Sequence, residues 1–121
     1  MTRRPVGWLI GLSLLCGIAL AHHAEPLYDM NHPMTVTGMI SRVEWANPHV
    51  YLYLNVRNDQ GAIEEWSIEL TAPHSLQRYG WTSSTVKPGD QIACTGGRAK
   101  SGARALRSST VELPGGKKLR S

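Results

Sequence analysis

The chain has 121 residues, of which 41% are hydrophobic, and a formal net charge of +4 at neutral pH. Once an N-terminal leader is removed, that length suffices for one domain but not for two. Without Arg3 and Arg4, eleven basic residues face nine acidic ones, which leaves a net charge of +2. This small excess excludes the strongly basic surface of a nucleic-acid-binding protein, so we expect no nucleic-acid partner.

The first 21 residues have the pattern of a secretory signal peptide. Two arginines precede an apolar run over 6–20, and Ala19-Leu20-Ala21 supplies the small residues of a cleavage site. The run is short for a membrane-spanning helix and the rest of the chain has no second one, so we expect no retained transmembrane segment. Cleavage between Ala21 and His22 would release a periplasmic or secreted protein that begins with His22.

Behind the leader we expect an N-terminal segment (22–32), a folded domain (33–114) and a basic, frayed C-terminal tail (115–121). Apolar residues alternate over 34–45, and their parity slips between Ile40 and Val43. Such a slip predicts one long strand with a β-bulge.

A hairpin follows, formed by alternating segments at 49–56 and 63–70 around a turn at 58–61. Burying Leu54 together with Trp66 sets the parity of the pairing and predicts Tyr51 opposite Glu69 on the outer face. A left-handed Gly61 in the loop fits this register.

Residues 73–79 predict a short helix, because Pro73 suits its first turn and Gly80 the position after its end. Two further strands are predicted at 91–95 and 105–113, with a glycine-bracketed loop over 96–102. Three strands, one helix and two strands form an all-β chain with one short helix, in the order of an OB-like five-stranded barrel. A small β-sandwich is the alternative, although a helix after the third strand fits it less well.

Several short motifs also follow one another in a characteristic order, and together they resemble a bacterial family of small exported proteins, domain of unknown function 6152. The resemblance covers essentially the whole chain after the leader and implies an exported single domain, without implying an activity. His74 and the segment 30–34 depart from the family pattern. The motifs are His22-His23, Glu44-Trp45-Ala46-Asn47-Pro48-His49, Trp66-Ser67-Ile68-Glu69, Tyr79-Gly80-Trp81, Lys87-Pro88-Gly89-Asp90 and Val111-Glu112-Leu113-Pro114-Gly115-Gly116-Lys117.

The first candidate site is a metal centre formed by His22, His23 and His49, with the new α-amine as a further donor. The amine and imidazole of a terminal histidine form a chelate ring, and a further imidazole would complete a nitrogen set that suits copper, or zinc. Alternatively, His22 merely follows the cleavage site, and His49 is a hydrogen-bonded turn residue.

A weaker metal candidate combines Met30, His32 and Met34, which are spaced by two. In an extended segment their side chains would point the same way, and thioether with imidazole favours Cu(I). In the alternative interpretation Met34 continues the core, Met30 covers the mouth of the barrel and His32 lies at the surface.

The second kind of site is the outer face of the hairpin, where Tyr51, Tyr53 and Glu69 would bind a metal-free ligand or a protein. The alternative is an ordinary solvated strand face. We find no catalytic group of residues in the sequence. The strand alternation places Cys94 in the core, where its thiol is a poor nucleophile, and we expect the protein not to be an enzyme. The sequence therefore predicts a small exported binding or accessory domain whose partner is another exported protein or a small ligand.

Overall fold

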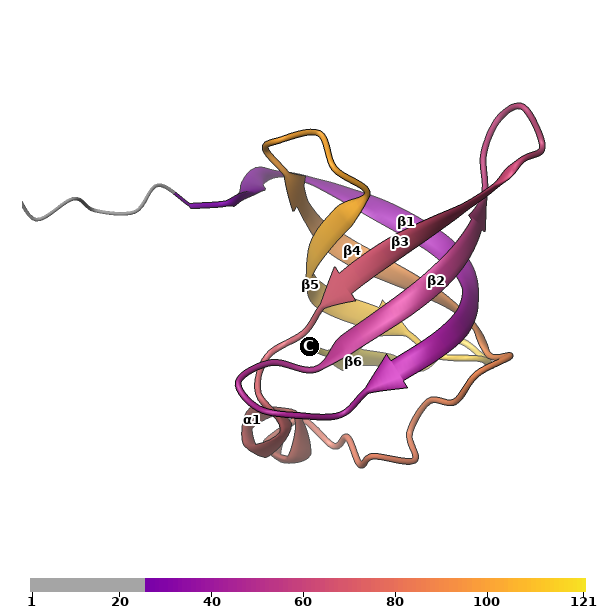
Figure 1. Ribbon diagram of the computed structural model, residues 1–121. Helices are drawn as coiled ribbons and strands as arrows, with labels where there is room; N and C mark the ends of the chain where they lie inside the picture. Colours follow the sequence, from indigo (N-terminus) through magenta and orange to yellow (C-terminus); the bar gives the residue numbers. More distant parts are fainter. Residues whose placement is uncertain (1–25) are drawn as a thin grey trace, which may run out of the picture.

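The computed structural model describes residues 26–121, which form six strands and one helix. The fold class predicted from the sequence is confirmed: apart from the helix, the regular structure is β, and the strands curl into an OB-like barrel (Figure 1). In chain order the elements are β1 (Tyr28–Glu44), β2 (Tyr51–Arg57), β3 (Ile63–Glu69), α1 (Pro73–Arg78), β4 (Gln91–Ala99), β5 (Ala105–Glu112) and β6 (Lys118–Arg120).

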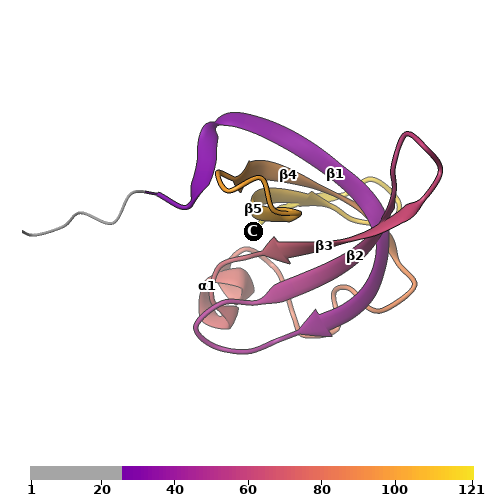
Figure 2. The same cartoon turned by 45° about the horizontal axis from the view of Figure 1, so that its top comes forward.

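The sheet runs in the order β3-β2-β1-β4-β5-β6, and a parallel pairing of β3 with β5 closes it into a ring. The closure is short, with Ser67 opposite Ala105 and Glu69 opposite Arg107. The other strand pairings are antiparallel. Strand β1 is long enough to pair with β4 over its first part and with β2 over its last part. Figure 2 shows how β1 bends over the barrel, which allows it to pair with both β4 and β2.

The predicted details of β1 and of the hairpin are confirmed. The pairing of β1 with β2 shifts between Ile40 and Arg42, where the parity slip placed a bulge. In the hairpin Leu54 lies opposite Trp66 and Tyr51 opposite Glu69, while Gly61 has a φ of 82°. Hydrophobic alternation therefore determines which side chains of β2 and β3 face outward.

The core fills the barrel, and α1 covers one end of it (Figure 1). Leu76 of the helix is fully buried, and the indole N–H of Trp81 donates to the carbonyl of Arg120 at 2.7 Å. Cys94 is also fully buried, and this burial raises the pKa of its thiol to about 12, which makes it a core residue and a poor nucleophile at neutral pH. In the part of the chain that the structure describes, no helix is long and apolar enough to cross a membrane.

The folded domain extends beyond the predicted limits of 33–114 at both ends. At its start, Tyr28 and Asp29 pair with the end of β4. At its end, β6 pairs with β5, and the hydroxyl of Ser121 donates to that of Ser108 at 2.7 Å. The expected frayed tail is therefore a strand, because Leu119 packs against the core among the basic residues that suggested solvent exposure.

The predicted loop at 96–102 is also shorter than expected, because Gly96 and Gly97 belong to β4. Both glycines allow a close approach of neighbouring backbones. A Cβ atom at Gly96 would lie 1.9 Å from the carbonyl oxygen of Arg107, and one at Gly97 would lie 2.6 Å from that of Asp29. The glycine pair is thus a feature of barrel packing, where β1 and β5 press against β4 from both sides.

Substitution of Gly96 tests this close approach. Gly96→Ala should lower the free energy of unfolding by about 3 kcal/mol or prevent folding, because the methyl group meets the backbone of β5. Gly61→Ala is the matched control: its Cβ has open space, and only the left-handed φ is unfavourable, for a loss of about 1 kcal/mol. Urea denaturation followed by tryptophan fluorescence measures both, and equal losses would contradict the packing explanation.

Candidate functional site

A row of polar side chains crosses the outer face of the barrel where β3 closes onto β5. The strand registers align Tyr51 of β2, Glu69 of β3 and Arg107 of β5. His49 lies just before β2 on the same face, in a segment held by backbone hydrogen bonds of Val50 to Thr71 and Leu70. Tyr28, at the start of β1, completes the group, which we call the Glu69 cluster: Tyr28, His49, Tyr51, Glu69 and Arg107.

Glu69 is the centre of this cluster. Its Oε1 lies 2.6 Å from Nδ1 of His49 and 3.3 Å from Nη1 of Arg107, and its Oε2 accepts a hydrogen bond of 2.8 Å from the Tyr28 hydroxyl. Only 12% of the Glu69 side chain is exposed. Because three groups from separate segments surround one carboxylate, its orientation is fixed.

The remaining bonds of the cluster connect it to the backbone and to the tyrosines. The Arg107 guanidinium also donates to the carbonyl of Leu70 at 2.8 Å, which holds it beside Glu69. Burial, together with the hydrogen bond and negative charge of Glu69, raises the pKa of Tyr28 to about 12. The pKa of Tyr51 is raised for the same reasons, burial first and the charge of Glu69 second. Both phenols therefore remain protonated at neutral pH.

His49 is the member of the cluster with the greatest capacity to bind a ligand. Its side chain is 39% exposed, and its Nδ1 faces Glu69, so that Nε2 lies on the opposite side of the ring. With Nδ1 beside the Glu69 carboxylate, Nε2 is the ring nitrogen that is open to a ligand, and a carboxylate next to the other nitrogen is common among metal-binding histidines.

The predicted partners of His49, the residues His22 and His23, lie outside the described residues. Within residues 26–121, no three side chains of the His, Cys, Asp and Glu types are grouped so that they could hold a metal ion. The described part of the site thus supplies one imidazole and its supporting carboxylate.

The second predicted metal set is not brought together by the fold. Met34 packs against the core, whereas Met30 lies over Gly97 and is 46% exposed. His32 is 83% exposed, and its Nδ1 lies 3.0 Å from Asp29. The regular alternation that would align the three is interrupted, since the pairing of β1 with β4 shifts between Asp29 and Met34.

The tyrosines of the predicted ligand-binding face lie side by side, with ring centroids 6.5 Å apart and an angle of 28° between the rings. Arg42 covers Tyr53, with its guanidinium carbon 3.7 Å from the ring centroid, and the Tyr53 hydroxyl donates to Glu44 at 3.3 Å. Of the predicted trio, Glu69 is enclosed in the cluster, whereas Tyr51 and Tyr53 are half-buried and expose part of their rings to a ligand.

Two members of the cluster, Tyr28 and Arg107, were not predicted from the sequence. Arg107 could have been identified by pairing β3 with β5 in parallel, as an OB-like barrel requires, because that pairing sets Arg107 opposite Glu69. Tyr28 precedes the predicted first strand, and no periodic pattern points to it. Only the three-dimensional path of β1 brings its hydroxyl to a residue 41 positions away.

Removal of the Tyr28 hydroxyl tests its role as a donor to Glu69. Tyr28→Phe should lower the free energy of unfolding by about 1 kcal/mol near pH 8, the usual contribution of such a bond. The raised pKa makes this contribution complete below the unfolded value of 10.0 and progressively lost toward pH 12. Urea titrations at about pH 8 and about pH 11 should therefore show the difference between the two proteins shrinking at the higher pH. A difference that stays constant would contradict this assignment.

Comparison with solved structures finds a fold likeness to a mitochondrial single-stranded DNA-binding protein, Rim1 of S. cerevisiae. The sequences are 12% identical, the TM-score is 0.49, and the alignment covers 68% of this chain and 93% of that one. At this level the likeness supports no conclusion about ligands, and the fold assignment rests on the strand pairings above.

No curated protein matches the chain. A family model does match, over residues 11–107. The matched range includes the whole Glu69 cluster, with Arg107 as its last residue. This match spans most of the sequence and agrees with the resemblance seen in the motifs. The chain belongs to the family of unknown function DUF6152.

Proposed function

We propose that this protein is an exported, non-enzymatic binding module that holds copper or zinc through His22, His23 and His49. The observation that carries the proposal is the contact of 2.6 Å between Nδ1 of His49 and Glu69. A carboxylate behind a histidine orients the ring and makes its outer nitrogen a better metal ligand. Glu69 is itself held by Tyr28 and Arg107, so the position of the carboxylate beside His49 does not depend on a single contact.

The position of Tyr28 supports the participation of the new N-terminus. Tyr28 bonds to Glu69, so the described chain begins close to His49. The four Cα–Cα steps from His22 to Pro26 span at most about 14 Å when extended, which sets the distance over which a processed terminus could reach the cluster. Cleavage after Ala21 would place an α-amine there, with a pKa of roughly 7.7–8.0, which can lose its proton to a metal at neutral pH.

The donor set favours copper over zinc. One α-amine and two or three imidazoles are nitrogen donors, and Cu(II) takes such donors in a tetragonal arrangement. Imidazole also suits zinc, which would take a tetrahedral arrangement of the same ligands. The fully buried Cys94 is not available to either metal.

A metal-free binding function is the second candidate, and the stacked pair Tyr51 and Tyr53 favours it. Two half-exposed rings next to hydrogen-bonding groups form a surface for an organic ligand or for a segment of another exported protein. This function uses the tyrosine rings and not Nε2 of His49, so the two candidates respond to different substitutions.

The test compares the chain that begins at His22 with the same chain carrying one extra N-terminal residue. We expect the extended chain and His49→Ala each to lose Cu(II) affinity and to change the electron paramagnetic resonance spectrum. Glu69→Gln, which keeps the shape of the side chain but removes its charge, should lower the affinity by about 10- to 100-fold. Thermal unfolding of each variant establishes that the barrel is intact.

His74→Ala is the matched control, because His74 is an exposed histidine on α1 outside the cluster. It should bind copper as the parent chain does. Equal affinity and identical spectra for the extended chain would exclude the α-amine as a ligand, and an unaffected His49→Ala would exclude the shared site. Tyr53→Ala, which alters the stacked pair outside the Glu69 cluster, should leave copper binding unchanged, and it would instead weaken binding in the metal-free alternative.

A further inference from the structure

A second candidate site lies on another part of the barrel surface, over β1, β4, β5 and β6. The strand registers align two neighbouring rows of side chains there, and residues at alternate positions face outward. One row reads Thr35, Thr95, Thr110 and Arg120. The other reads Thr37, Ala93, Glu112 and Lys118.

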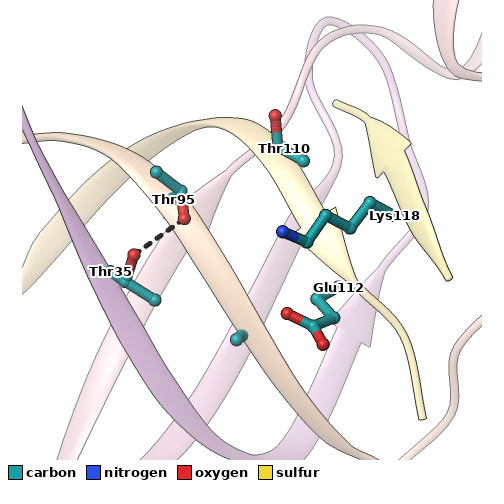
Figure 3. A pocket seen from close by; sticks show the side chains of 6 residues that line it. Thr35, Thr95, Thr110, Glu112 and Lys118 are labelled. Atoms are coloured by element: carbon teal, nitrogen blue, oxygen red, sulfur yellow. Dashed lines mark hydrogen bonds between the residues drawn. The ribbon is translucent and has the colours of Figure 1, made fainter. Parts of the chain in front are cut away.

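A hollow of about 370 Å³ opens between these rows, and the small side chain of Ala93 leaves room for it. Figure 3 shows its lining: the hydroxyls of Thr35 and Thr95 on one side, and Thr110, the Lys118 ammonium and the Glu112 carboxylate on the other. The volume is within the range typical of small-molecule sites. None of the lining residues belongs to the Glu69 cluster.

Two opposite charges remain available over this hollow. Glu112 and Lys118 are direct cross-strand partners, a position where opposite charges usually pair. Within residues 26–121, however, neither side chain takes part in an ion pair. Arg120, the other cation of these rows, lies with its guanidinium carbon 4.8 Å from the ring centroid of Tyr79, which leaves Lys118 as the cation that lines the hollow.

The hydroxyls add directional hydrogen bonding. Oγ1 of Thr35 and Oγ1 of Thr95 are 2.8 Å apart, so one hydroxyl donates to the other. The accepting hydroxyl keeps its own hydrogen for a third group, and both oxygens keep lone pairs. A ligand in the hollow therefore meets a carboxylate, an ammonium and a hydroxyl pair at once.

From this arrangement we propose that the hollow binds a small zwitterion, namely a free α-amino acid with a polar side chain. The ligand ammonium would contact Glu112, its carboxylate would contact Lys118, and its side chain would face the threonine hydroxyls. A ligand with only one of the two charges leaves a protein charge without a partner and binds more weakly. This site is independent of metal binding by the Glu69 cluster.

The probe is L-serine, added to the chain that begins at His22 and followed by two-dimensional amide NMR. Saturable shifts are expected at Thr35, Ala93, Thr95 and Thr110. N-acetylserine lacks the ammonium and serine amide lacks the carboxylate, so each should bind about tenfold more weakly, as for the loss of one charge contact.

Three variants assign the contacts. Glu112→Gln should abolish the preference for serine over N-acetylserine, and Lys118→Gln the preference for serine over serine amide. Ala93→Ile should remove binding without any change in charge, because the larger side chain fills the hollow. All three sites lie on the outer face, and the unperturbed NMR signals of the core report an intact fold.

Lys117→Gln is the charge control, since it removes the same charge from the adjacent, exposed residue. It should leave serine binding unchanged. The proposal is overturned if serine causes no saturable shift, if the blocked derivatives bind as well as serine does, or if Lys117→Gln weakens binding as much as Lys118→Gln.

Discussion

The parallel contact between β3 and β5 is the constraint on which the rest of the structure depends. It is only three residue pairs long, yet without it the strands would form an open sheet with two edges. Closure encloses the core and also brings Arg107 beside Glu69, two residues that are 38 positions apart. A contact that the fold requires for its closure thus also organises the polar cluster around Glu69.

The Glu69 cluster and the hollow beside Ala93 illustrate two ways in which a barrel surface acquires chemistry. In the cluster, side chains from three separate segments converge on the Glu69 carboxylate, and the result is a fixed carboxylate beside His49. In the hollow, the strand register alone sets threonines, a glutamate and a lysine in rows, and a small residue leaves the space. The first depends on tertiary convergence, and the second on sheet geometry.

Features set by local alternation could be predicted from the sequence, as the hairpin register and the bulge in β1 demonstrate. The parity of buried residues leaves only one arrangement of Leu54 and Trp66 that avoids burying glutamates. Features set by close contacts between distant segments could not. Gly96 was assigned to a loop because the backbone that it must approach, that of Arg107, belongs to the next strand. Tyr28 was not recognised because its hydrogen-bond partner, Glu69, lies 41 residues away in the chain. The location of His49 on the same hairpin face as Glu69 was predictable, whereas Arg107 joins them only through closure of the barrel.

The long first strand has a consequence for the order in which the molecule can assemble. Its last part pairs with β2, a few residues away, whereas its first part needs β4, more than fifty residues later in the chain. The ring itself cannot close before residues 105–107 are available. Such long-range pairings slow folding, and an incomplete chain emerging from the ribosome has no stable barrel to form. A polypeptide with this topology therefore cannot complete its barrel until nearly all of it has been made.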